Sequence, residues 1–141
     1  MTKENYIIIS IGSNYNQKEN ISFAKKKLAG MLGEQTSFTR DMWTEPVGIQ
    51  SEKFINCICI STTRHTLLQL SKAFKQLERK CKRSKKNDLI NKIPLDIDIL
   101  LYGEQRYHEK DWERQYIQEL LHDFFDKKGN FVIDPTILLN T

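Results

Sequence analysis

The chain contains few residues that break or cross-link a fold: 3 prolines, 6 glycines and 3 cysteines among 141 residues. So little glycine and proline excludes a collagen-like or low-complexity protein. An odd number of cysteines argues against a disulfide framework, so we expect buried thiols. No apolar run approaches the roughly 18 residues that a membrane span needs, and residues 1–6 are too polar for the core of a secretory signal. We therefore expect a cytoplasmic protein with no membrane partner.

The composition is that of an ordinary globular protein. Hydrophobic residues make up 39% of the chain and charged residues 28%, and a chain of this length buries about two-thirds of its unfolded surface. No repeat or linker divides the sequence. We therefore predict a single domain over residues 1–141, and we expect a monomer.

Hydrophobic periodicity predicts an alternation of strands and helices. Runs of β-branched and apolar residues predict strands over 6–11, 35–42, 54–62 and 93–102, and stripes of period 3.6 predict helices over 16–33 and 66–83. This βαββαβ order is that of an α+β, ferredoxin-like sandwich, in which two helices cover one face of an antiparallel sheet. The pattern then predicts a C-terminal helical extension over 112–125 and a short strand over 131–133.

Positive charge is concentrated in one segment. Between residues 72 and 92, nine Lys and Arg residues against two acidic residues give a charge of +7, which leaves −3 for the rest of a chain whose net charge is +4. A localised basic segment is typical of a surface that binds a polyanion, either a nucleotide or a nucleic acid. A solvated helix face explains the charge equally well.

Asp96 and Asp98 flank Ile97 in a predicted strand, so their carboxylates point to the same side, roughly 7 Å apart at the backbone. Such a pair needs a counter-ion, and Mg²⁺ suits it because magnesium takes one or two carboxylates together with water and substrate phosphates. The alternative is the solvated edge of a half-buried strand. The neighbouring basic segment favours magnesium, since nucleotide phosphates need both a metal and cationic side chains.

Several short motifs occur in a characteristic order. They are Ile-Gly-Ser-Asn at 11–14, Thr-Glu-Pro-Val-Gly at 44–48, Phe-Ile-Asn at 54–56, Gln-Leu-Glu at 76–78 and Leu-Asp-Ile-Asp-Ile-Leu-Leu-Tyr-Gly at 95–103. With them, residues 6–116 resemble the 6-hydroxymethyl-7,8-dihydropterin pyrophosphokinases of folate biosynthesis. That family has a ferredoxin-like fold and transfers pyrophosphate from ATP to a pterin alcohol. A P-loop of the Gly-x-x-x-x-Gly-Lys type does not occur, so phosphoryl chemistry here uses another scaffold.

The resemblance implies a role for each matching residue. Asp96 and Asp98 would hold two magnesium ions between the ATP phosphates and the attacking hydroxyl. The pterin would be bound by Thr44, Val47, Phe54, Asn56 and Tyr116, with Asn56 at the ring edge and the two aromatic residues as walls. The nucleotide would be bound by Glu78, Arg83, Ile99, His108 and Arg114. Arg83, Lys85 and Lys92 would cover the phosphates from a flexible loop over 84–92.

Some of these residues also have a purely structural interpretation. Phe54 lies in a β-branched run and is as readily explained as a core residue. Asn56 lies among apolar neighbours, where an unpaired amide costs about 1 to 3 kcal/mol, so it requires a partner. A pterin is one candidate for that partner, and a strand irregularity is another.

Leu89, Ile90 and Ile93 stand where the family usually has Arg, Trp and Arg. Losing an arginine that neutralises transition-state charge costs on the order of a hundredfold in rate. Our first interpretation is an Mg²⁺-dependent pyrophosphokinase that acts on ATP and a pterin alcohol. A paralogue that binds pterin or nucleotide without transfer is the second. An RNA-binding ferredoxin-like domain ranks last, because the sequence has no RNP-type signature, and we expect no nucleic-acid partner.

Overall fold

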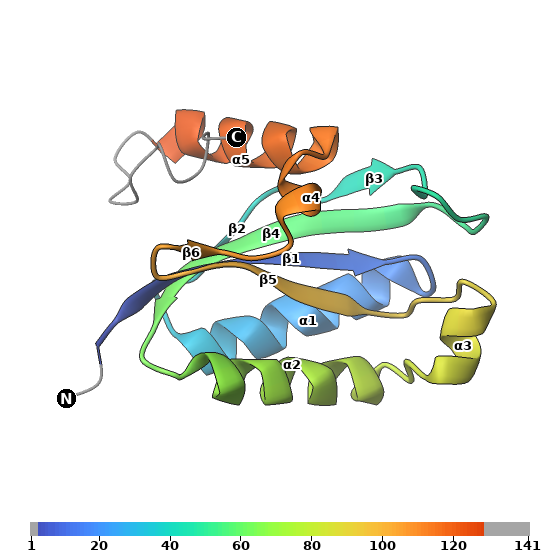
Figure 1. Ribbon diagram of the computed structural model, residues 1–141, viewed down its shortest axis with the longest axis horizontal. Coiled ribbons are helices and arrows are strands. Elements are labelled where there is room, and N and C mark those ends of the chain that lie inside the picture. Colours follow the sequence, from blue (N-terminus) through green and yellow to red (C-terminus); the bar gives the residue numbers. More distant parts are fainter. Residues whose placement is uncertain (1–2, 129–141) are drawn as a thin grey trace.

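Six strands form one antiparallel sheet in the computed structural model, which describes residues 3–128. They are β1 (Asn5–Ser13), β2 (Ser37–Phe38), β3 (Met42–Thr44), β4 (Phe54–Thr63), β5 (Asp96–Tyr102) and β6 (Gln105–Arg106). The long strand β1 lies in the middle, between β4 and β5, and the order is β2-β4-β1-β5-β6 with β3 also paired to β4 (Figure 1). The predicted α+β class with an antiparallel sheet is confirmed.

Helices cover both faces of this sheet. They are α1 (Gln17–Leu32), α2 (Leu67–Lys80), α3 (Lys85–Leu89), α4 (Glu109–Trp112) and α5 (Gln115–Lys128). Figure 1 shows α1 and α2 side by side on one face and α5 on the other, with α3 at the end of the sheet where β5 begins. Among residues 3–128, none of the helices combines the length and the apolar character needed to cross a bilayer.

Two strands are shorter than predicted because side chains replace backbone groups as hydrogen-bond partners. The strand predicted over 35–42 is divided into β2 and β3. Between them, the Thr39 hydroxyl accepts the N–H of Ile58 at 2.9 Å, a bond that a continuous ladder would give to a carbonyl group. The strand predicted over 93–102 begins only at Asp96, since the N–H of Ile93 is bonded to the side chain of Asn14 at 2.6 Å.

Other predicted boundaries also change. The loop predicted over 84–92 contains α3, whose first turn is capped by the Ser84 hydroxyl, which accepts the N–H of Asn87 at 3.1 Å. The helix predicted over 112–125 is observed as α4 and α5, with a break between them. The strand predicted over 131–133 lies outside the described residues.

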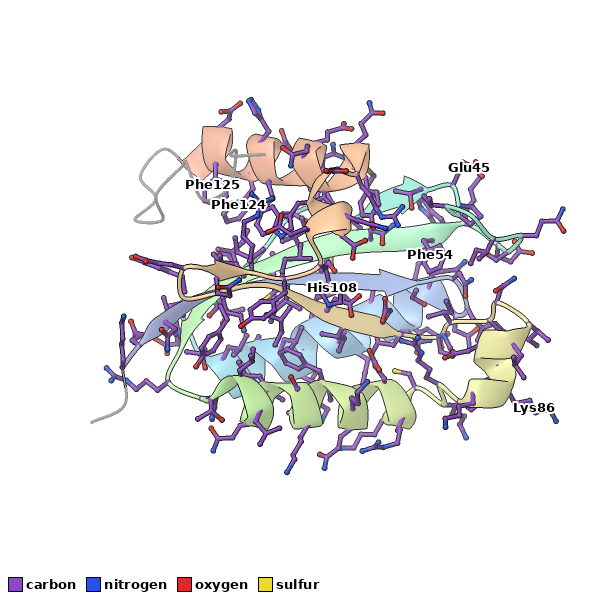
Figure 2. The ribbon with its side chains drawn as sticks, viewed as in Figure 1. Glu45, Phe54, Lys86, His108, Phe124 and Phe125 are labelled. Atoms are coloured by element: carbon purple, nitrogen blue, oxygen red, sulfur yellow. The ribbon has the colours of Figure 1, made fainter. Side chains whose placement is uncertain are left out.

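The sheet buries apolar side chains on both of its faces. Along β1, Ile7 and Ile9 pack against α1 and α2, whereas Ile8 belongs to the core beneath α5. Figure 2 shows Phe124 on the inner side of α5, between this helix and the sheet. The thiols of Cys57 and Cys59 are buried, as predicted, and burial raises the pKa of Cys57 to about 12.

The face beneath α5 is apolar at one end and polar at the other. Side chains alternate along a strand, so Ile8 in the core shares its face with Ser10 and Gly12 further along β1. Gly12 lies opposite Asn56 on β4 and opposite Asp96 on β5. The fold therefore brings the predicted pterin-binding amide and the predicted metal ligand to neighbouring strands at one end of the sheet.

Candidate active site

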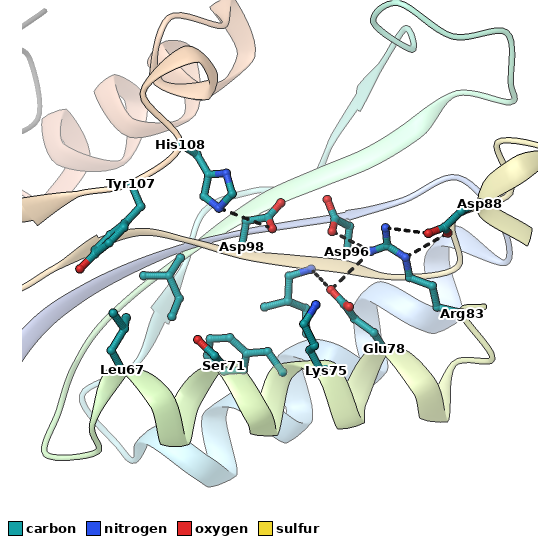
Figure 3. Close-up of a pocket in the computed structure, with 13 residues that line it drawn as sticks. Leu67, Ser71, Lys75, Glu78, Arg83, Asp88, Asp96, Asp98, Tyr107 and His108 are labelled. Carbon is teal, nitrogen blue, oxygen red and sulfur yellow. Dashed lines mark hydrogen bonds and ion pairs between the residues drawn. The ribbon is translucent and has the colours of Figure 1, made fainter. Parts of the chain in front are cut away.

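Asp96 and Asp98 stand at the boundary between two cavities. Both carboxylates project from β5 on the same side, as their spacing predicted (Figure 3). A cavity of about 500 Å³ lies along the edge of β5, between α2 and residues 107–108. A cavity of about 170 Å³ lies on the sheet face between β3 and the start of α5. Both aspartates line both cavities, so a ligand in either one would meet the carboxylate pair.

The Asp98 carboxylate is buried close to other negative charges. Burial raises the pKa of Asp98 to about 8, helped by the negative charge of Asp96 and a hydrogen bond to it, and by the charges of Glu78 and Asp111. The nearest basic group to Asp98 is His108, whose Nε2 lies 3.9 Å from Oδ1. With its pKa raised in this way, the Asp98 carboxyl holds a proton that a divalent cation would replace.

Asp96 has a cationic partner of its own. The Arg83 guanidinium lies 2.8 Å from Asp96 Oδ1, 3.2 Å from Asp88 Oδ1 and 3.5 Å from Glu78 Oε2 (Figure 3). It therefore connects α2, α3 and β5 at the mouth of the larger cavity. The charge of Arg83 is already shared among three carboxylates in this state.

Glu78 fixes the edge of β5 to α2. This residue is 8% exposed, and its Oε2 accepts the N–H of Ile97 at 2.8 Å. This N–H needs a side-chain acceptor because β6 pairs with β5 only at Leu101 and Tyr102. By the alternation of a strand, the backbone groups of Ile99 face the same edge, in the wall of the larger cavity.

The larger cavity changes in character along α2. Leu67 and Tyr107 form an apolar end, while Arg83 and Asp88 lie at the charged end (Figure 3). Between them, the side of α2 that lines the cavity contributes three polar side chains at helical spacing, Ser71, Lys75 and Glu78. The cavity therefore suits an elongated ligand with an apolar end, and its charged end accepts an anionic group only together with cations.

The smaller cavity contains all five residues predicted to bind the pterin: Thr44, Val47, Phe54, Asn56 and Tyr116. Asn56 is 8% exposed, and its Nδ2 donates to the Thr44 hydroxyl, so this amide has a protein partner. A Cβ at Gly12 would lie 2.9 Å from Asn56 Oδ1 and 3.6 Å from the Phe54 ring. Glycine at this position allows the amide and the ring to lie directly over β1.

The residues predicted to bind the nucleotide divide between the cavities. Glu78, Arg83, Ile99 and His108 line the larger cavity. Arg114 instead lines the smaller cavity, where its Nε lies 3.1 Å from Asp111 Oδ1.

Two predicted phosphate-binding lysines lie elsewhere in the structure, because neither lines either of these cavities. Lys85 is exposed on α3, and Lys92 Nζ lies 3.8 Å from the centre of the Tyr15 ring. Leu89 and Ile90, at the family's usual Arg and Trp positions, are 85% and 67% exposed. Of the three cations expected to cover the phosphates, only Arg83 lines either of these two cavities.

Sequence reasoning missed several side chains that line the cavities. Ser10 and Gly12 follow Ile8 with period 2 on β1, and this alternation was visible in the sequence. Ser71 and Lys75 follow Leu67 at intervals of four residues on α2, which is also a visible pattern. The period alone did not reveal which stripe of the helix faces β5.

Asp96 and Asp98 are the residues that would hold a metal ion. In the part of the chain that the structure describes, no group of three or more His, Cys, Asp or Glu side chains is placed to hold an ion. Two carboxylates that open onto a cavity fit Mg²⁺, which completes its octahedron with water and phosphate oxygens. They do not fit zinc, which takes three or four protein ligands, most of them nitrogen or sulfur.

The fold and the site together define an α+β protein in which a carboxylate pair joins two cavities of different character. A family model described as 7,8-dihydro-6-hydroxymethylpterin-pyrophosphokinase (HPPK) matches residues 8–126. The chain therefore belongs to the 7,8-dihydro-6-hydroxymethylpterin-pyrophosphokinase family, as the motifs predicted. It is also 30% identical over 129 residues to the folate synthesis bifunctional protein of Arabidopsis thaliana, an alignment that covers 83% of this chain. The chain spans 26% of that relative's length.

Proposed function

We propose that this protein transfers pyrophosphate from ATP to 6-hydroxymethyl-7,8-dihydropterin, in a magnesium-dependent step of folate synthesis. The observation that carries the proposal is that Asp96 and Asp98 line both cavities. Metal held there would touch a phosphate in the larger cavity and a hydroxyl in the smaller one. Membership of the family and the name of the plant relative support the same activity. The sheet order, with α1 and α2 on one face, supports a ferredoxin-like classification.

The smaller cavity supplies the pterin subsite. Phe54 and Tyr116 provide aromatic surfaces on which a flat heterocycle gains on the order of 1 kcal/mol each by stacking, beyond the area that it buries. The Asn56 amide donates to Thr44, which orients its Oδ1 as an acceptor for the N–H groups of the ring. These residues therefore fix the plane and the edge of the ring before the reaction.

The larger cavity supplies the ATP subsite. Its apolar end, near Leu67 and Tyr107, suits the base, for which the edge of β5 at Ile99 offers backbone groups. Its charged end, with Arg83 and His108 beside the aspartate pair, would hold the triphosphate once magnesium is bound. The two substrates would then meet at Asp96 and Asp98, and holding reactants in line accounts for much of the acceleration in such transfers.

The charge of the larger cavity explains the need for magnesium. Lys75 and Arg83 face four carboxylates there, those of Glu78, Asp88, Asp96 and Asp98, which gives a formal charge of −2 when all four are ionised and His108 is neutral. A triphosphate would be repelled from such a surface. Magnesium, when bound, would neutralise the aspartate pair and polarise the phosphate that is attacked. We infer two ions from the resemblance to the family.

Isothermal titration with a non-hydrolysable ATP analogue tests the binding step. We expect binding in the presence of magnesium, and its loss with EDTA or in Asp96→Ala. Equal affinity of the wild type and Asp96→Ala would disprove the metal role. An assay of AMP release with the pterin alcohol then tests transfer.

A family member that binds without transfer is the second candidate. The placement of Lys85 and Lys92 outside both cavities, together with Leu89 and Ile90 in place of Arg and Trp, favours it. The same AMP-release assay separates the two functions. Turnover above the enzyme-free blank excludes the second candidate, and magnesium-dependent binding without turnover supports it.

A further inference from the structure

Lys75 is a cation in the larger cavity that the sequence motifs did not identify. It lies on α2, between Ser71 at the middle of the cavity and Glu78 near the aspartate pair (Figure 3). Its positive charge acts on Glu78, but among the described residues Lys75 takes part in no ion pair. It is therefore a charge without a fixed anionic partner in a cavity rich in carboxylates.

The other cations near the site either contact other side chains or point away from the sheet. Arg83 is shared among three carboxylates, and Arg114 is paired with Asp111 in the smaller cavity. Lys92 lies over the Tyr15 ring. Lys86 points from α3 away from the sheet (Figure 2). Lys75 is the lysine that lines the larger cavity, so a phosphate that enters this cavity would contact its ammonium group.

The position of Lys75 along the cavity selects a particular phosphate. If the base lies at the apolar end and the outer phosphates lie at the aspartate pair, the phosphate next to the ribose passes the middle of α2. Lys75 lies near the middle of α2, which runs from Leu67 to Lys80, whereas Arg83 follows the end of the helix. An ammonium group on a flexible stem reaches a phosphate oxygen as a point charge.

We propose that Lys75 binds the α-phosphate of ATP, the phosphate that leaves with the nucleoside as AMP. This inference rests on the proposed function of the site. Lys75 is a substrate-binding residue, and its charge also offsets the negative charge that builds up on the leaving AMP. The alternative is that Lys75 is one more solvated lysine on the exposed face of a basic helix.

Lys72 provides a matched control for this distinction. It lies three residues earlier on α2, it is exposed, and it does not line the larger cavity. Both lysines contribute equally to the net charge. A general electrostatic effect would therefore appear in both variants, and a direct phosphate contact would appear only at Lys75.

The test compares dissociation constants of Lys75→Met, Lys75→Arg, Lys72→Met and the wild type in magnesium. The ligands are a non-hydrolysable ATP analogue, AMP and adenosine, with adenosine measured by competition. We expect Lys75→Met to weaken the ATP analogue and AMP on the order of tenfold, with adenosine unchanged. Lys75→Arg should retain most of the affinity, and Lys72→Met should match the wild type.

Three outcomes would overturn the inference while leaving the proposed function intact, provided that the wild type binds the ATP analogue. They are unchanged AMP affinity in Lys75→Met, an equal loss in Lys72→Met, and a loss for adenosine as large as that for AMP. If the wild type itself does not bind the analogue in magnesium, both proposals are wrong. Thermal unfolding of each variant confirms that the fold is retained.

Discussion

Asn14 and Ile93 are 79 residues apart and are joined by two hydrogen bonds. The Asn14 Oδ1 accepts the Ile93 N–H at 2.6 Å, and the Asn14 N–H donates to the Ile93 carbonyl oxygen at 2.9 Å. The Asn14 side chain also donates to the Asn91 carbonyl at 2.7 Å. The turn after β1 therefore fixes the backbone that leads into Asp96.

Replacing this side chain should loosen the approach to the aspartate pair. Asn14 is 3% exposed, so Asn14→Ala leaves partly buried backbone groups of Ile93 and Asn91 without partners. We expect a loss on the order of 2 kcal/mol in the free energy of unfolding, measured with urea. Asn14→Asp keeps the acceptor for Ile93 and should lose less. Equal stability of Asn14→Ala and the wild type would show that this junction is not stabilising.

Gly12 should be required for the pterin subsite. An added methyl group would lie 2.9 Å from Asn56 Oδ1, so Gly12→Ala must displace the amide. We expect affinity for the pterin alcohol to fall on the order of tenfold, with a smaller effect on the ATP analogue. Gly30→Ala is the control, since a methyl group there meets nothing within 4 Å, and alanine favours the helix. A Gly12→Ala protein that binds pterin normally would contradict the role of Asn56.

Stability should depend on pH through Asp98. Its folded pKa is about 8, above the ordinary value of 3.8, because of burial and the charge of Asp96. The folded protein therefore holds a proton that the unfolded chain releases, so this contribution is present below about pH 4 and is lost as pH rises towards 8. In EDTA, the stability of the wild type relative to Asp98→Asn should fall between pH 5 and pH 8. Parallel curves for the two proteins would refute the raised pKa.

The bond between Glu78 and Ile97 should stabilise the edge of β5. Glu78→Ala removes the acceptor of a buried N–H and should cost on the order of 2 kcal/mol in urea unfolding. Glu78→Gln retains an acceptor oxygen and should cost less, although it loses the 3.5 Å ion pair with Arg83. Both variants lose the charge, so equal stability of the two would show that the charge and not the hydrogen bond is the main contribution.

The sequence was sufficient where local pattern decides the structure. The isoleucine run of β1 and the apolar stripe of α2 specify their own elements, and two aspartates separated by one residue share a side of any strand. The features that the sequence did not indicate depend on contacts between segments that are far apart in the chain. Lys92 packs on Tyr15, which lies much earlier in the chain, and Arg83 contacts Asp96, which follows α3. Both outcomes depend on where the backbone of 84–92 runs, which periodicity does not encode.

Helix α5 covers only one end of its sheet face. Ile8 and Leu100 are buried beneath it, while Ser10 and Asp98, the next positions on the same face, open into the smaller cavity. A flat ring bound in the smaller cavity would cover the part of the sheet face that α5 does not cover. Ligand binding is then linked to folding, and the fraction of unfolded chains falls as ligand concentration rises above its dissociation constant. In a cell depleted of that ligand, this protein would be degraded faster.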